Sequence, residues 1–305
     1  MNAVVAPAPP ARPSLLRRIV TYWVSRLLLT LAVFVVLFIL LSLTLSRLPL
    51  DSLATQEAAG TVAALGAIML VTLRVERRPL AEVGLGLRGL PMQWMRGFAV
   101  GAGVMTACTL ILALFGGYRV VGLSLALGPL LAGLLLHIGV GLFEEGLFRG
   151  ILFRLLEEGL GSWVALAITM VIFGAAHLAN PQATLWGATA IMVEAGVLFG
   201  TAYMLTRSLW FVAGLHTAWN FLQGPIYGFS ISGSGATTNS LLRPSIQGPD
   251  LLTGGVFGME ASLIAVLIGL ALGVWFAVGA ARGRKTLHPL LWRGGINRLG
   301  AAADA

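Results

Sequence analysis

Residues 27–46 read Leu-Leu-Leu-Thr-Leu-Ala-Val-Phe-Val-Val-Leu-Phe-Ile-Leu-Leu-Ser-Leu-Thr-Leu-Ser, without a single charged side chain. An α-helix needs about 20 apolar residues to cross the hydrocarbon core of a bilayer. The run is also longer than the apolar region of a secretory signal peptide, which is about 7–15 residues. We therefore predict that this segment is a retained first membrane span.

The composition of the whole chain points to the same class of protein. Hydrophobic residues make up 57% of the 305 residues and charged residues only 10%, whereas a soluble domain carries roughly 25% charged residues. The single cysteine, Cys108, excludes an intrachain disulfide. The net charge of +8 does not indicate nucleic acid, because the basic residues lie between and outside the apolar runs. The lipid bilayer is the expected surrounding.

Further apolar runs, separated by turn signals such as Asn180-Pro181 and Gly224-Pro225, follow the first. They predict an all-α fold, a polytopic membrane bundle of about eight transmembrane helices. The predicted spans are residues 27–46, 58–74, 97–115, 125–155, 162–179, 183–206, 209–223 and 259–281.

The positions of the basic residues predict the orientation, since cytoplasmic loops are enriched in Lys and Arg. With the N-terminus inside, 17 of the 20 basic residues fall on the inner side, and Arg47, Arg119 and Arg243 fall outside. Both termini are therefore predicted to be cytoplasmic. The outer connection 224–258 is long and rich in Gly and Ser, so it is either a flexible lid or a plain surface loop.

Three polar constellations lie within these spans: Glu144-Glu145-x-x-x-Arg149, Phe173-x-x-x-His177 and His216-x-x-x-Asn220. Charged and imidazole groups are costly in hydrocarbon, so such a cluster predicts a functional site. Its groups supply a base, a second proton-handling group and hydrogen-bond donors, which are the parts needed to hydrolyse a peptide bond with water. The alternatives are a charged helix end at the membrane surface and histidines that only pack.

Helical spacing predicts different roles for the residues of these motifs. Residues four apart share a face, so we expect Glu145 to pair with Arg149, and His216 and Asn220 to point at one spot. Glu144 is rotated from Glu145 by about 100°. It is left without a cation on its own helix and is the candidate general base.

The three motifs can meet only if their residues lie at similar depths in the membrane. If the fourth helix continues to Glu158, Glu144 lies near its middle and can meet His177 in a polar cavity, which we expect to open towards the cytoplasm. Two residues rank lower as site candidates: Glu194, in the middle of a span, and His137, seven residues before Glu144. His288, in the basic C-terminal tail, is expected to be solvated.

These residues resemble the CAAX prenyl protease 2-like or ABI family, the CPBP intramembrane proteases, which show the same three motifs in the same order. Glu-Glu-Gly-Leu-Phe-Arg-Gly at 144–150, and Thr253-Gly-Gly-x-Phe-Gly-x-Glu260, are also similar to the family, the latter to a bacterial branch. The resemblance covers about residues 80–280. It implies a protease core over 81–281, preceded by a cytoplasmic tail (1–26) and two transmembrane helices (27–80) and followed by a basic tail (282–305).

The resemblance implies an intramembrane endopeptidase. Glu144 and His177 activate a water, His216 and Asn220 form the oxyanion hole, and Glu145 and Arg149 shape the site. The implied substrate is a peptide or a membrane protein, with or without a prenyl group. The arginine-dominated composition is typical of a high-GC bacterium, which favours a bacterial cell membrane and a substrate other than a CAAX box.

Other functions fit the same residues. Glu144, His177 and His216 could hold Zn²⁺ with a water, although the His-Glu-x-x-His spacing is absent; the resemblance favours a metal-free mechanism without a cofactor. A non-catalytic role as a bacteriocin self-immunity factor or scaffold would make the cluster structural. A transporter would use Glu194 as much as Glu144, but the sequence shows no inverted repeat.

Overall fold

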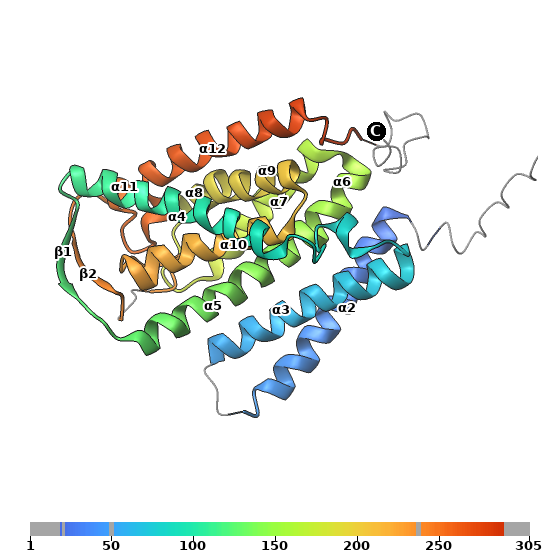
Figure 1. Ribbon diagram of the computed structural model, residues 1–305, viewed down its shortest axis with the longest axis horizontal. Helices are drawn as coiled ribbons and strands as arrows, with labels where there is room; N and C mark the ends of the chain where they lie inside the picture. The colour runs from blue at the N-terminus through green and yellow to red at the C-terminus, as the bar shows by residue number, and fades with distance from the viewer. Residues whose placement is uncertain (1–18, 20–21, 49–51, 236–238, 290–305) are drawn as a thin grey trace, which may run out of the picture.

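The computed structural model describes residue 19 and residues 22–48, 52–235 and 239–289. Most of the predicted N-terminal tail (1–26) and most of the basic C-terminal tail (282–305) lie outside these residues. The described chain is a bundle of helices with one small pair of strands at one end (Figure 1). This architecture confirms the predicted all-α polytopic bundle.

The longer helices are α2 (Trp23–Leu45), α3 (Ser52–Val71), α4 (Leu90–Leu114), α5 (Leu127–Glu145), α7 (Ser162–Ala176), α9 (Val197–Thr206), α10 (Leu209–Phe221) and α12 (Leu263–Arg282). The shorter helical elements are η1 (Thr72–Glu76), η2 (Leu80–Val83), η3 (Gly146–Phe153), α6 (Arg154–Leu160), η4 (His177–Ala179), α8 (Leu185–Ile191), η5 (Met192–Gly196), η6 (Leu222–Ile226), α11 (Asp250–Thr253) and η7 (Met259–Ala261). The strands are β1 (Tyr118–Leu123) and β2 (Leu242–Ile246).

Seven helices in the described part of the chain are long and apolar enough to cross a membrane. They correspond to seven of the eight predicted spans. The exception is the span predicted over 209–223, because the α-helix there, α10, has only 13 residues. Almost all of α10 is buried, so this helix is covered by protein rather than by lipid.

Glycines let the neighbouring helices approach α10 closely. A Cβ on Gly97 of α4 would lie 1.9 Å from the Phe211 carbonyl oxygen, and one on Gly214 would lie 2.2 Å from the Trp94 carbonyl oxygen. A Cβ on Gly141 of α5 would likewise lie 2.8 Å from the Ala213 carbonyl oxygen. Small residues of this kind allow backbone-to-backbone packing in membrane bundles, where apolar side chains alone give little preference for protein over lipid.

The fourth predicted span is a continuous rod, as the depth argument requires. Helices α5, η3 and α6 follow one another without a gap from Leu127 to Leu160. The central part, η3, is π-helical and begins directly after Glu145. Such π-helical turns are rare and occur frequently at functional sites. Three more are described: η1, η5, which contains Glu194, and η6, which begins two residues after Asn220.

The described part of the connection 224–258 is more ordered than a flexible lid or a plain surface loop. Strand β2 pairs antiparallel with β1, a pairing between distant segments that the sequence pattern did not predict. Nearer α10, the Gln182 amide donates to the Gly233 carbonyl at 2.8 Å, and the Gly233 amide donates to the Phe257 carbonyl at 2.8 Å. The described part of 224–258 is therefore fixed to the bundle at several points.

The opposite end of the bundle carries buried ion pairs. Arg154 of α6 contacts Glu76 at 2.9 Å, Arg26 of α2 contacts Glu76 at 3.4 Å and also Glu158, and Arg207 contacts Glu157 at 2.5 Å. These interactions join α2, η1, α6 and the α9–α10 turn. Arg154 and Glu157 are thus buried, and each pairs with a residue of another segment, so they are not exposed charges at a helix end.

The close approach of α4 to α10 gives a stability prediction. Gly97→Ala should destabilise the protein by about 1–3 kcal/mol, the usual cost of forcing extra atoms into a packed site, measured by thermal unfolding in detergent. Gly103→Ala is the control, because an added Cβ there meets no described atom within 4 Å. Equal unfolding temperatures for the two variants would contradict the packing described here.

Candidate active site

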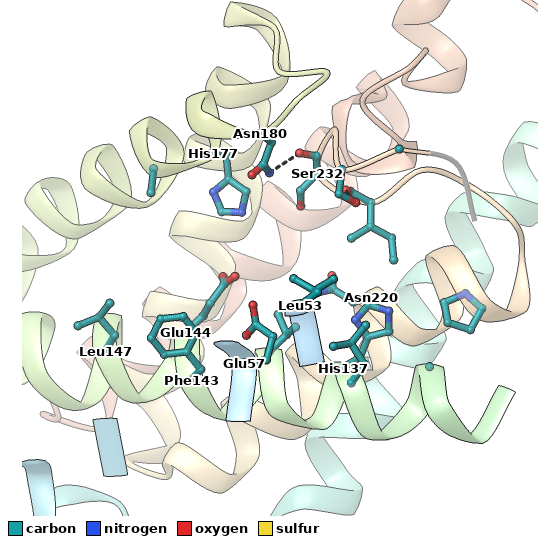
Figure 2. A pocket seen from close by; sticks show the side chains of 18 of the residues that line it. Leu53, Glu57, His137, Phe143, Glu144, Leu147, His177, Asn180, Asn220 and Ser232 are labelled. Carbon is teal, nitrogen blue, oxygen red and sulfur yellow. Dashed lines mark hydrogen bonds between the residues drawn. The ribbon is translucent and has the colours of Figure 1, made fainter. Parts of the chain in front are cut away.

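The three motifs contribute to one cavity of about 770 Å³. Glu144 of α5, His177 of η4 and Asn220 of α10 line it together (Figure 2). His177 faces Glu144 across the cavity in this view. Residues from three separate helices therefore meet at one cavity, as the motifs predict.

Glu145 lies behind the cavity wall and is fully buried. Its Oε1 atom accepts two hydrogen bonds, one from Arg149 Nη1 and one from His216 Nδ1, each at 2.8 Å. The predicted i, i+4 pair with Arg149 is present, and the bond to His216 was not predicted. One carboxylate oxygen thus joins η3 to α10.

Aromatic rings enclose the Arg149 guanidinium. Its central carbon lies 4.8 Å from the centre of the Phe173 ring and 5.5 Å from that of Phe199, distances at which a cation is attracted to the ring face. Arg149 Nη2 also donates to the Ala195 carbonyl oxygen at 3.4 Å. Phe173, the first residue of the second motif, therefore packs against the cation of the first motif.

His216 is oriented by Glu145. A carboxylate accepts, so the Nδ1 atom that faces Glu145 carries the proton. The second ring nitrogen, Nε2, lies 3.9 Å from Glu144 Oε2. The imidazole therefore stands between the two adjacent glutamates, bonded to the buried one and facing the one that lines the cavity.

His177 is oriented in the same manner by the backbone. Its Nδ1 lies 2.8 Å from the Phe173 carbonyl oxygen, and because a carbonyl only accepts, Nδ1 is the donor. The Nε2 atom of the neutral ring is then left with its lone pair available. His177 has a fixed tautomer with an acceptor nitrogen for the cavity.

Glu144 and Asn220 complete the set. Glu144 Oε2 is buried and has no hydrogen-bond partner among the described residues, so it is free to accept a proton. Asn220, one helical turn after His216, is buried at the cavity wall. The cavity lining thus combines the Glu144 carboxylate, the His177 imidazole and the Asn220 amide, while His216 lies outside the lining and faces Glu144.

The lower-ranked residues divide between the cavity and the interior. His137 lines the cavity, and its Nδ1 atom has no hydrogen-bond partner within the described chain. Glu194 does not line the cavity. It is fully buried in η5, next to Gly269 of α12, and neither of its carboxylate oxygens has a hydrogen-bond partner in the part described. His288 is exposed.

The cavity also contains residues that the sequence did not indicate. Glu57 of α3 lines it beside Glu144 and His137 (Figure 2), although the second span was predicted to begin only at residue 58. The helix in fact begins at Ser52, so Glu57 lies one turn inside it. On the opposite side, Asn180 Nδ2 donates to the Ser232 carbonyl oxygen at 2.6 Å.

In the predicted orientation, the cavity lining extends towards the outer end of the bundle, so this orientation and the predicted cytoplasmic opening disagree. The lining continues from Glu144 to Pro129 and Gly133, near the start of α5, and to Pro225 and Ser232 in the connection after α10. These residues lie towards the end of the bundle that carries β1 and β2, which is the outer end in the predicted topology. Buried ion pairs fill the other end, around Arg154.

The zinc alternative can be tested against the donor atoms. Among the described residues, no group of three or more His, Cys, Asp or Glu side chains is arranged to hold a metal ion. His216 Nδ1 bonds Glu145 and His177 Nδ1 bonds a backbone carbonyl, which leaves one nitrogen of each ring, on different helices. A zinc-ligating histidine also uses one ring nitrogen while the other donates to a carboxylate or a backbone carbonyl, so these bonds do not exclude zinc. We derive no step through a metal.

The fold and cavity define a multi-pass membrane protein with a buried glutamate–histidine site. Residues 125–222 match the family described as type II CAAX prenyl endopeptidase, Rce1-like. The matched segment runs from just before α5 to just after α10 and contains all three motifs. This match supports the resemblance to the CAAX prenyl protease 2-like family that the three motifs carry. No curated protein matches the sequence.

The buried Glu145–Arg149 pair gives a second stability prediction. Arg149→Gln leaves the Glu145 carboxylate buried without its guanidinium, and breaking a buried pair in this way costs about 3–5 kcal/mol. We expect a large drop in the unfolding temperature in detergent.

The control for this prediction is Arg78→Gln. The Arg78 side chain is 33% exposed and contacts Glu82 at 3.8 Å and Glu158 at 3.5 Å. Such partly exposed pairs contribute only about 0–1 kcal/mol each. If the two variants unfold at the same temperature, the Glu145–Arg149 pair does not hold the site together.

Proposed function

We propose that the protein is an intramembrane endopeptidase that hydrolyses a peptide bond in a membrane-associated peptide or membrane protein with a glutamate-activated water. The observation that supports this most strongly is the convergence of Glu144, His177 and Asn220 on one cavity, with His216 3.9 Å from Glu144. No metal or other cofactor takes part in the proposed reaction. The predicted bacterial membrane and cytoplasmic termini are part of the proposal.

The first step is the activation of water. The Glu144 side chain lines the cavity and is 23% exposed, and His177 Nε2 has a free lone pair. A water in the cavity can donate one hydrogen to each. Glu144 then accepts a proton as the water oxygen attacks the carbonyl carbon of the substrate, which is general base catalysis.

The second step is stabilisation of the oxyanion. The carbonyl oxygen of the substrate becomes negative in the tetrahedral intermediate, and the Asn220 amide can donate a hydrogen bond to it. His216 donates through Nε2 when both ring nitrogens carry protons, and the Glu144 and Glu145 carboxylates balance that charge. When the intermediate collapses, Glu144 returns its proton to the leaving amine, so no proton is lost from the balance.

Glu144→Gln should lower kcat/KM for peptide cleavage by at least about a hundredfold, because general base catalysis typically contributes this much or more. The measurement is cleavage of a library of hydrophobic and prenylated peptides by purified protein in detergent, with and without a strong chelator. We expect the wild type to be insensitive to the chelator and Glu144→Gln to unfold at the wild-type temperature.

Glu82→Gln is the matched control, since Glu82 lies on η2, outside the cavity, and its side chain is 52% exposed. It should cleave like the wild type. Retained cleavage by Glu144→Gln would show that Glu144 is not the general base. Chelator inhibition would restore the zinc alternative, and a wild type that cleaves nothing would favour the immunity or scaffold role.

Asn220→Ala should lower kcat by about 10²–10³-fold, the usual effect of removing one oxyanion donor. The KM should change little, because the hydrogen bond is strongest only when the negative charge has formed. Asn220→Asp keeps the size of the side chain but loses the amide donor, so it should be equally impaired. An Asp variant as active as the wild type would show that Asn220 only fills space.

A further inference from the structure

The cavity holds a second carboxylate beside the proposed base. Glu57 belongs to α3, outside the matched segment 125–222 and outside all three motifs. Its Oε2 atom, like Glu144 Oε2, is buried without a hydrogen-bond partner in the described chain. Thr61 Oγ1 donates to the Gly139 carbonyl oxygen at 2.9 Å and holds α3 against α5 at this level. The packing of the two helices therefore fixes Glu57 in the cavity wall.

In the described part of the wall, histidine is the only basic side chain beside these two acids. No lysine or arginine is present among the described residues that line the cavity. The nearest guanidinium in the site, that of Arg149, is already bonded to Glu145 and covered by Phe173 and Phe199. A buried carboxylate without a partner is unfavourable, and a cation brought within about 4 Å offsets part of that cost.

A second group in the same wall can accept a hydrogen bond from a cationic side chain. His137 is only 7% exposed, lines the cavity, and has a buried Nδ1 atom without a hydrogen-bond partner in the described structure. Figure 2 shows His137 and Glu57 on the same side of the cavity as Glu144. An imidazole nitrogen accepts hydrogen bonds from ammonium and guanidinium groups.

We propose that Glu57, with His137, forms a subsite for a positively charged side chain of the substrate, a lysine or arginine close to the scissile bond. The inference rests on the proposed protease function and adds the class of substrate. A cation at this subsite pairs with Glu57, whereas a carboxylate there meets two like charges. The same wall therefore disfavours a substrate whose free C-terminal carboxylate has to enter the cavity.

The test uses peptides of one apolar sequence in which a single position is Lys, Gln or Glu, moved through three residues on each side of the scissile bond. Acetylated N-termini and amidated C-termini leave the varied side chain as the only charge. At one or more positions the wild type should cleave the Lys peptide with a kcat/KM at least about tenfold above that of the Gln peptide, as expected for a close charge pair. The Glu peptide should be the poorest.

Variants assign this preference to Glu57. Glu57→Gln should bring the Lys-to-Gln ratio of kcat/KM to about one, and Glu57→Asp should keep part of the ratio because it keeps the charge. Glu82→Gln is the control with one acid removed outside the cavity, and it should keep the full ratio.

Two results would overturn the subsite and leave the protease function intact: equal cleavage of Lys, Gln and Glu peptides by the wild type, or a preference for Lys that survives Glu57→Gln. Failure of the wild type to cleave any peptide in the set would instead count against the protease function and the subsite together.

Discussion

The site depends on one carboxylate oxygen, Glu145 Oε1. It accepts a hydrogen bond from Arg149 on its own helix and another from His216 on α10, so it sets the distance between the two helices that carry the proposed chemistry. Because the whole group is buried, each partner is needed to balance the charge of the others. The bond to Glu145 also decides which nitrogen of His216 faces Glu144. An interaction that looks structural thus determines the geometry of the proposed catalytic groups.

The local spacing of the motifs predicts much of this arrangement. Residues four apart on a helix are neighbours, which accounts for the Glu145–Arg149 pair and for the placement of His216 and Asn220 on one side of α10. The continuation of the fourth span to Leu160 follows from the strongly helical run after Gly150. What local patterns cannot predict are contacts between distant segments: the pairing of β1 with β2, the contribution of Glu57 from α3, and the second bond of Glu145. Each depends on how whole helices pack.

Local sequence patterns do not show in which direction the cavity extends. At one end of the fourth span, Arg26, Glu76, Arg154 and Glu158 satisfy one another in a buried network. At the other end, backbone hydrogen bonds such as that from Gln182 to Gly233 hold the connection after α10 against the bundle, and Ser232 and Gly235 of this connection line the cavity.

The most direct test of the account is single-turnover cleavage of a hydrophobic peptide by the purified wild-type protein in ¹⁸O-labelled water, followed by mass spectrometry of both the products and the enzyme. Attack by a water that Glu144 activates predicts one ¹⁸O atom in the new C-terminal carboxylate and none in the enzyme. Label in the Glu144 carboxylate would show instead that this residue attacks the substrate directly, and an unlabelled, uncleaved peptide would contradict the assignment of a protease site to this cavity.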